Sequence, residues 1–368
     1  MRFSAGSSTA LRLANAQGHQ FSYSRNEISS FRHKPEPWRA LKGRVTLIAP
    51  SQAPKPAACG PKGGKRAPLL PLRKGHWLEA MHLGDTSATI ESVNLMAKTI
   101  TRKIETSHCT IATEMTTGNG LDVVLIHGNS SCRAVFERQL HSGLGETHRL
   151  ICFDLPGHGQ SGDARQKERT YPLPGLADAA LEVLEALDIR NPVLVGWSLG
   201  GHIAIEMVSR QHDFRGLFIT GTPPVGVDIS EGFCGSLLKG LAASSSFSQE
   251  QALQFTDRVF GSSATPELVK AAARTDGDFR ATLFSEARIA EKSNQREVVS
   301  STKTLTAVVN GAADSIVNLD YVDHVPYANL WRHRCFRIAF AGHAPSLQNS
   351  AVFNHYLAEF LSDVESAQ

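Results

Sequence analysis

The pentapeptide Gly196-Trp197-Ser198-Leu199-Gly200 places a serine where it could act as a nucleophile. It lies between an apolar run, residues 192–195, and a run with helical spacing, residues 202–211. This arrangement predicts a strand, a sharp turn and a helix, with the serine hydroxyl presented at the turn. The flanking glycines suit such a turn because the strand and the helix approach too closely for larger side chains. Ser198 is therefore the candidate nucleophile for acyl transfer.

Two downstream residues could activate this serine, which needs a base within hydrogen-bond reach and a group that orients the base. His343 follows a predicted strand over residues 336–340, and Asp314 follows another over residues 305–310. Open α/β sheets gather their ligands past the carboxyl ends of the strands. We therefore expect both side chains to meet Ser198 at one edge of a sheet.

The chain order Ser198, Asp314, His343 is that of α/β-hydrolases and differs from the order in other serine-triad folds. From about Met96 to the C-terminus, the sequence resembles single-domain α/β-hydrolase-fold proteins with a serine nucleophile. The resemblance covers about 270 residues in the expected order. It is carried by Asp314 and by four motifs: His127-Gly128-Asn129, Asp154-Leu155-Pro156-Gly157-His158-Gly159-Gln160-Ser161, Gly196-Trp197-Ser198-Leu199-Gly200-Gly201-His202, and Gly342-His343-Ala344-Pro345.

The resemblance implies a role for each matching residue. Ser198 would be the nucleophile, and His343 would serve as the general base and then as the general acid. Asp314 would orient the imidazole. The backbone N–H groups of Asn129 and Leu199 would form the oxyanion hole, which stabilises the charge that develops on the substrate oxygen.

Trp197 precedes the nucleophile, and a residue at this position can line the substrate pocket with a flat apolar wall. We therefore predict that Trp197 contributes to substrate binding. A serine at the nucleophile position indicates acyl transfer, whereas an aspartate there would have indicated the alkyl-enzyme chemistry of haloalkane dehalogenases and epoxide hydrolases.

Four other residues near Asp314 could compete for places in the triad: His324, His333, Asp320 and Asp323. Neither histidine follows a strand and a glycine, as His343 does, and both aspartates lie further from the preceding strand than Asp314. His127 precedes the oxyanion loop, and we expect it to support that loop by hydrogen bonding rather than to act on substrate.

Strand-like runs alternate with amphipathic segments from residue 100 onward. The predicted strands are residues 100–104, 109–115, 123–126, 150–153, 192–195, 216–219, 305–309 and 336–339. The first two resemble an antiparallel pair, and helical periodicity marks residues 176–187 and 351–361. The pattern predicts an α/β-hydrolase fold, with a mostly parallel eight-stranded sheet and helices on both faces.

Residues 223–301 interrupt this alternation with a stretch about twice the usual crossover length. It contains helix-like pieces at residues 237–243, 250–260, 266–274 and 278–291, and no clear strand. The stretch resembles the helical cap that these enzymes place over the active site, where a cap excludes water and shapes the pocket. Two or three of its apolar side chains are expected to reach the pocket.

Residues 1–95 precede the recognisable domain, which we predict over residues 96–368. Residues 1–80 carry 14 Lys and Arg against 3 Asp and Glu, are rich in Ser, Pro and Gly, and show no periodicity. We expect this segment to be disordered. It could lie upstream of the true start, at Met81 or Met96, which is the preferred interpretation. It could also be an organelle transit peptide or a basic arm.

Composition excludes several classes of function. The six cysteines form no C-x-x-C pair, so neither a disulfide scaffold nor a zinc site is expected, and a reducing, cytoplasmic location is predicted. No apolar run approaches 18 residues, so no membrane span is expected. No aromatic-interleaved basic motif predicts a nucleic-acid partner, and no ligand spacing predicts a metal or a cofactor.

The sequence therefore predicts a hydrolase that cleaves a carboxylic ester of a small acyl substrate through an acyl-enzyme intermediate. The same fold and triad also host cofactor-free perhydrolases of the haloperoxidase type, lactonases and C–C bond hydrolases, and these alternatives stay open. Outside catalysis, some hydrolase-fold proteins are ligand receptors. The substrate and the oligomeric state are not predicted.

Overall fold

A computed structural model of the chain describes residues 97–210, 213–235, 237–285 and 292–367, together with the backbone of two short strands near the N-terminus. The chain divides into two compact units, Met1–Ala88 and Thr89–Gln368. In the first unit, β1 (Leu11–Ala14) pairs antiparallel with β2 (Gln20–Tyr23). The remainder of the segment predicted to be disordered, residues 1–95, lies outside the described residues.

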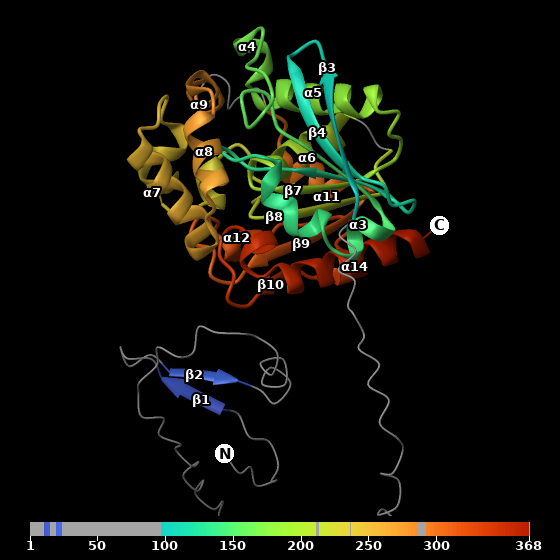
Figure 1. Cartoon of the computed structure of the whole chain (residues 1–368). Helices are drawn as coiled ribbons and strands as arrows, with labels where there is room; N and C mark the ends of the chain where they lie inside the picture. The colour runs from blue at the N-terminus through green and yellow to red at the C-terminus, as the bar shows by residue number, and fades with distance from the viewer. Residues whose placement is uncertain are drawn as a thin grey trace, which may run out of the picture. The chain divides into compact units, whose positions relative to one another are not determined.

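An eight-stranded sheet forms the centre of the second unit (Figure 1). Its order is β10-β9-β8-β7-β5-β6-β4-β3. The strands are β3 (Thr99–Glu105), β4 (Thr110–Thr116), β5 (Asp122–Ile126), β6 (Arg149–Phe153), β7 (Val193–Trp197), β8 (Gly216–Thr220), β9 (Leu305–Gly311) and β10 (Phe336–Ile338). β4 pairs antiparallel with β3 and β6, and the remaining neighbours are parallel. The predicted fold class, including the opening antiparallel pair, is confirmed.

β5 illustrates why the sheet is covered on both faces. Successive side chains of a strand point to opposite faces. Val123 and Leu125 belong to one buried apolar cluster, whereas Val124 and Ile126 belong to the other. All four side chains are fully buried. Such a run of β-branched and aliphatic residues suits a parallel strand in the middle of a three-layer structure.

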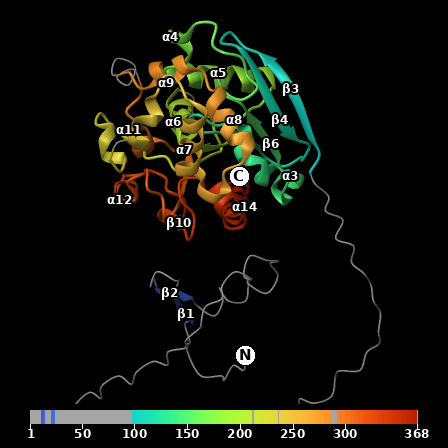
Figure 2. The same cartoon turned by 60° about the vertical axis from the view of Figure 1, so that its left-hand side comes forward.

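Helices cover both faces of the sheet (Figures 1 and 2). One apolar cluster takes side chains from η3 (Arg133–Phe136), α2 (Glu137–Leu140), α3 (Gly143–Thr147) and α14 (Ser350–Ser366). The other takes them from α5 (Leu173–Ala186), α6 (Leu199–Arg210), α11 (Gln295–Ser301) and α12 (Leu319–Asp323). The shorter helices α4 (Lys167–Thr170), η7 (Trp331–His333) and α13 (Pro345–Gln348) lie in the connections. Among the described residues, no helix combines the length and hydropathy that crossing a bilayer requires.

The described elements between β8 and β9 are helices. They are η4 (Ile229–Gly232), η5 (Leu237–Ala243), α7 (Gln249–Phe260), η6 (Gly261–Ser263), α8 (Pro266–Arg274), α9 (Gly277–Leu283) and α11. We call η5, α7, α8 and α9 the cap helices, and α7 and α8 are drawn side by side in gold and orange in Figure 1. α9 ends at Leu283, before the end of the helix-like piece predicted over residues 278–291, and the Phe284 N–H still makes a helical bond to the Arg280 carbonyl (3.2 Å). Residues 286–291 lie outside the described part.

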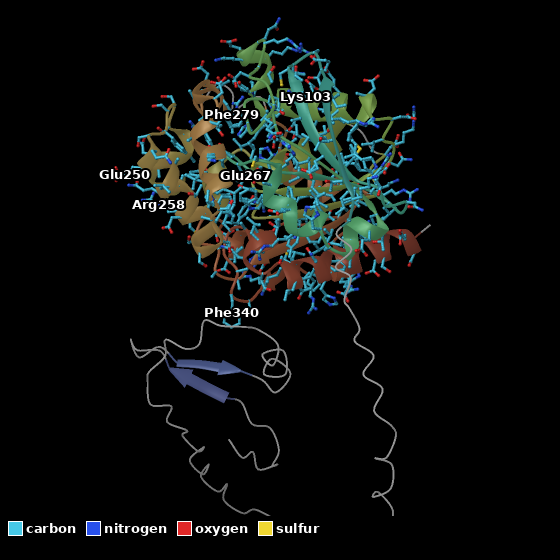
Figure 3. All side chains as sticks on the ribbon, in the orientation of Figure 1. Lys103, Glu250, Arg258, Glu267, Phe279 and Phe340 are labelled. Carbon is cyan, nitrogen blue, oxygen red and sulfur yellow. The ribbon has the colours of Figure 1, made fainter. Side chains whose placement is uncertain are left out.

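α7 shows why the cap helices form and how they face. Ser248 and Gln251 make a reciprocal capping box at its N-terminus, which satisfies two otherwise unpaired N–H groups. Phe255 is buried on the inner side, whereas Glu250 and Arg258 are exposed on the outer side (Figure 3). The helix is therefore amphipathic, with its apolar stripe directed inward.

Candidate active site

Ser198 occupies a tight turn between β7 and α6. Its φ is 53°, in the left-handed region that non-glycine residues rarely adopt. The Ser198 N–H donates to the Thr220 carbonyl (2.9 Å), and the Thr222 hydroxyl donates to the Ser198 carbonyl (2.8 Å). These bonds hold the serine at the apex of the turn, where strained backbone commonly accompanies function.

Gly200 and Gly201 allow α6 to lie directly against the sheet. A Cβ added at Gly200 would collide with the carbonyl oxygen of Ile126 in β5, and one at Gly201 would collide with Thr222. Larger residues at these positions would push α6, and the serine at its start, away from the sheet.

The side chains of Ser198, His343 and Asp314 form one hydrogen-bonded chain. The Ser198 Oγ lies 3.0 Å from His343 Nε2, and His343 Nδ1 lies 2.9 Å from Asp314 Oδ2. The Nδ1–H of His343 donates to the carboxylate, which leaves Nε2 free to accept the serine proton. The structure thus brings together three residues that lie on the loops after β7, β9 and β10.

The Asp314 carboxylate is buried but well satisfied. Its second oxygen accepts the backbone N–H groups of Ile316 (2.8 Å) and Val317 (3.1 Å). Burial by itself would raise the pKa of Asp314, but His343 and these two amides favour the charged form. The net direction is a lowered pKa, so the group is an anion at neutral pH.

The loop that carries His343 is anchored at both ends. The Gln348 Oε1 accepts the N–H groups of Gly342 (2.8 Å) and Ala344 (3.2 Å), and the Trp197 indole N–H donates to the His343 carbonyl (2.7 Å). No pattern in the sequence predicts the Gln348 contact. Because these bonds involve backbone on either side of His343, they fix where its ring can point.

The two predicted oxyanion donors, Asn129 and Leu199, line the same cavity as Ser198. Leu199 is the first residue of α6, so its N–H has no acceptor within its own helix. A helix N-terminus also favours negative charge nearby. The other loop comes close as well, since a Cβ at Gly128 would lie 3.1 Å from the Ser198 Cβ.

Two buried histidines support the loop that contains Asn129. His127 donates from Nδ1 to the Gly128 carbonyl (2.8 Å) and accepts the Leu155 N–H at Nε2 (3.0 Å). The Nε2 of His158 accepts the Ser130 N–H (3.2 Å). Burial lowers the pKa of both imidazoles, so they remain neutral and can accept these bonds.

A cavity of about 140 Å³ opens beside the Ser198 hydroxyl. Its lining is mainly apolar, with Ser198, His343, Asn129, His202 and Lys292 as the polar members. The apolar lining residues are Leu173, Trp197, Leu199, Val225, Ile229, Phe233, Ala242, Phe255, Val259, Leu283, Phe284 and Ile316. Such a concave, apolar site with a few convergent polar groups suits a small organic ligand.

The lining includes the predicted Trp197, which is 1% exposed. From the cap stretch it includes eight apolar residues, among them Phe233, Phe255 and Leu283, where two or three were expected. His202 also lines the cavity and shares a hydrogen bond with Gln295 (2.6 Å). Burial lowers the pKa of His202 to about 4, so it contributes a neutral ring. The sequence pattern alone did not predict that His202 would line the cavity.

The competing residues make contacts of their own away from the serine. Asp320 and Asp323 pair with Arg337 at 2.9 and 2.6 Å, and the His324 Nδ1 lies 2.6 Å from the Asp320 carbonyl. His333 is exposed. Within the described ranges, no group of three His, Cys, Asp or Glu side chains could hold a metal ion.

Known proteins match this chain over much of its length. The pimeloyl-[acyl-carrier protein] methyl ester esterase of Pseudoalteromonas atlantica is 26% identical over 261 residues, which cover 67% of this chain and 96% of that protein. The enzyme of the same name from Vibrio cholerae is 35% identical over 103 residues, which cover 28% of this chain and only 37% of that protein.

Among solved structures, a mutant of the N-acyl homoserine lactonase AidH in complex with N-hexanoyl homoserine superposes with a TM-score of 0.71. It is 40% identical and covers 73% of this chain and 98% of its own. The alpha/beta hydrolase family matches residues 123–356, well over half of the chain. This match, the strand order and the turn at Ser198 agree, and the chain belongs to the alpha/beta hydrolase family.

Proposed function

We propose that this chain, a hydrolase that acts on ester bonds, cleaves carboxylic esters with Ser198 as nucleophile, His343 as base and Asp314 as the orienting group. The observation that carries this proposal is the hydrogen-bonded chain from Ser198 Oγ through His343 to Asp314, with links of 3.0 and 2.9 Å. It lies at the wall of an apolar cavity that can hold an acyl group.

In the acylation step, Ser198 Oγ attacks the ester carbonyl carbon while His343 Nε2 takes the hydroxyl proton. The carbonyl oxygen becomes an oxyanion, which the N–H groups of Asn129 and Leu199 stabilise. The imidazolium is stabilised by Asp314 and then gives its proton to the leaving alcohol. The product of this step is an acyl ester on Ser198.

In the deacylation step, a water molecule replaces the departed alcohol. His343 removes a proton from the water as it attacks the acyl carbonyl, and the same two N–H groups hold the second oxyanion. Collapse of this intermediate returns the proton to Ser198 and releases the carboxylic acid. The cap stretch, residues 223–301, would exclude bulk water during both steps.

Labelling with a fluorophosphonate probe tests the proposal directly. We expect a covalent adduct on Ser198, found by peptide mass spectrometry, and no adduct in Ser198→Ala. The same variant should lose up to about 10⁶-fold in kcat on p-nitrophenyl esters. An unlabelled wild-type protein would indicate a ligand receptor, and full activity of the variant would reject Ser198 as nucleophile.

A lactone is a second candidate substrate, and the likeness to the N-acyl homoserine lactonase AidH favours it. A lactone is a cyclic ester, so the same attack by Ser198 would open the ring and leave the alcohol attached to the acyl product. The apolar side chains of the cavity could receive the N-acyl chain, since burying each methylene contributes about 0.8 kcal/mol.

Hydrolysis rates of N-hexanoyl homoserine lactone and methyl hexanoate, measured side by side, would separate the two candidates. A kcat/KM at least tenfold higher for the lactone would support the lactonase. Peroxide-dependent halogenation and the cleavage of C–C bonds in β-diketones complete the panel. A dominant rate in either of these reactions would replace ester hydrolysis as the main activity.

A further inference from the structure

Arg280 in α9 is a buried arginine in the cap. It is 1% exposed, and its guanidinium lies over the Phe247 ring with 4.1 Å between Cζ and the ring centroid. Its Nε donates to the Ser244 carbonyl (2.6 Å) and its Nη2 donates to the Thr275 carbonyl (3.3 Å). The side chain therefore joins the end of η5 to the turn between α8 and α9.

One contact of Arg280 leaves the cap and reaches the core. Its Nη1 donates to the Ser130 hydroxyl (3.0 Å), and this hydroxyl donates in turn to the Asn129 side-chain oxygen (2.9 Å). The side-chain Nδ2 of Asn129 donates to the Ala242 carbonyl in η5 (3.1 Å). The residue proposed to supply an oxyanion donor is thus tied to the cap by two separate hydrogen-bonded links.

No carboxylate forms an ion pair with Arg280 within the part of the chain that the structure describes. Burying a cation costs folding free energy, and the hydrogen bonds, the ring contact and the charge of Asp276 oppose that cost here. Burial lowers the pKa of Arg280 to about 10, so the group is still charged at neutral pH. An apolar side chain would fill the same space without the free-energy cost of burying a charge. The hydrogen bonds that the guanidinium donates are therefore the feature that distinguishes Arg280 from an apolar residue.

The segment that receives this contact is strained. Ser130 has a φ of 52°, in the left-handed region that costs a non-glycine residue free energy. Its N–H is held by His158, and its hydroxyl is held by Arg280. A loop held in such a conformation keeps its shape only while the surrounding contacts determine it, and the cap supplies one of them.

We propose that Arg280 is a positioning residue that fixes the backbone N–H of Asn129 through the Ser130 hydroxyl, so that the cap helps to form the oxyanion hole. This inference rests on the proposed function. Oxyanion donors act on charge that develops only in the transition state. Loss of the link should therefore lower kcat and leave KM nearly unchanged.

Ser130→Ala is the sharpest test because it removes one hydroxyl and leaves both packing and charge in place. We expect kcat to fall about 10- to 100-fold, as a small misplacement of a catalytic group does, with KM within about twofold of wild type. Affinity for a boronic acid, which forms a tetrahedral adduct with the serine, should fall by the same factor. Arg280→Met should act in the same way, and the double variant should be no worse than the more severe single one.

Arg274→Met is the matched control. Arg274 also joins the cap to the core, donating to the carbonyls of Gly157 (2.8 Å) and Ser161 (2.7 Å), but it does not contact Ser130 or Asn129. This variant should lower the melting temperature and leave kcat unchanged. Equal losses of kcat in Arg274→Met and Arg280→Met would mean general anchoring of the cap and would overturn the proposal.

Unchanged kcat in Ser130→Ala would also overturn it, whatever happens to the arginine variants. Fluorophosphonate labelling of Ser198 in the wild-type protein separates this outcome from a failure of the proposed function. If the wild-type protein is labelled and Ser130→Ala has a normal kcat, only the proposed role of Arg280 is rejected. If the wild-type protein is not labelled, the serine mechanism itself is rejected.

Discussion

The sheet edge and the cap helices line the same cavity, but different interactions hold them. At the sheet edge, Ser198, His343 and Asp314 are fixed by hydrogen bonds to one another and to backbone a few residues away. The cap is held by apolar side chains such as Phe255 and by the long polar side chains of Arg280 and Arg274. Directional bonds specify the orientation of a group, whereas apolar burial is roughly proportional to area and is non-directional.

This difference suggests separate roles for the sheet edge and the cap helices. Groups that would transfer a proton need correct distances and angles, and the sheet edge supplies them. The part of the cavity that would receive the acyl chain needs only a fitting apolar surface, which many combinations of cap side chains could supply. We therefore expect substitutions at the sheet edge to change kcat, and substitutions of the apolar cap side chains that line the cavity to change substrate preference. Arg280 is the exception among the cap residues, because its proposed link to Asn129 acts on kcat.

Of the substitutions that test this comparison between the sheet edge and the cap, Asp314→Asn should have the largest effect. The amide cannot hold the required tautomer of His343, and kcat should fall about 10⁴-fold while KM changes little. Steady-state kinetics on a p-nitrophenyl ester measure both. Asp320→Asn is the control, because this carboxylate pairs with Arg337 at the surface. If both variants lost activity equally, the assignment of the orienting acid would be wrong.

Gly128→Ala tests how closely the sheet edge is packed. The new Cβ would lie 2.9 Å from the Trp197 ring and 3.1 Å from the Ser198 Cβ, and both groups are fixed. The free energy of unfolding should fall by about 1–3 kcal/mol, the usual cost of overpacking, as measured by urea denaturation. Gly143→Ala, where nothing lies within 4 Å of the added Cβ, should not destabilise the protein. An unchanged free energy of unfolding in Gly128→Ala would show that the backbone at the sheet edge can shift to accommodate the added Cβ.

Leu283→Ala tests the cap. Leu283 lines the cavity, so its truncation should weaken hydrolysis of hexanoyl esters about tenfold and leave acetyl esters nearly unaffected. The measurement is kcat/KM against acyl-chain length. Leu253→Ala removes an exposed leucine of α7 and should leave the profile unchanged. An equal loss for all chain lengths would mean that Leu283 affects the chemical step rather than acyl recognition.

The smallest effect concerns pH. Burial lowers the pKa of His158 well below the 6.5 of an exposed imidazole, so only the unfolded chain takes up a proton there as the pH falls below about 6.5. Stability is therefore full above that pH and is lost toward the lowered pKa. The melting temperature should be lower at pH 5 than at pH 7.5, and His158→Gln should reduce that difference. An equal difference in both proteins would assign the acid sensitivity to other groups.

The sheet could be predicted from the sequence because its strands are short apolar runs that end in turn residues. The apolar run of β5, for example, is followed by His127 and Gly128, as buried parallel strands often are. Strand ends were less accurate. β7 continues to Trp197, two residues beyond the prediction, because pairing of Trp197 with Thr220 of β8 extends it. That pairing depends on a strand distant in sequence.

Contacts between distant side chains could not be predicted from the sequence. Gln348 and Arg280 are ordinary polar residues in helical segments, where the pattern alone indicates exposure to solvent. Only the folded chain brings Gln348 to the backbone on either side of His343 and buries Arg280 within the cap. The motif residues could be predicted from the sequence because they lie in loops at strand ends, where local sequence constrains them. The residues that hold them in place, such as Gln348 and Arg280, depend on tertiary packing.

The indole of Trp197 limits how this protein could be redesigned. It walls the cavity and, through the 2.7 Å bond to the His343 carbonyl, also braces the segment that bears the imidazole. Substitutions of Trp197 that enlarge the cavity for bulkier acids would also remove its hydrogen bond to the His343 carbonyl. Such variants would bind the larger substrate, but His343 would be poorly positioned and turnover would fail. Randomisation at Val259 and Leu283, which touch the acyl space without bracing the histidine, is the safer route to new specificity.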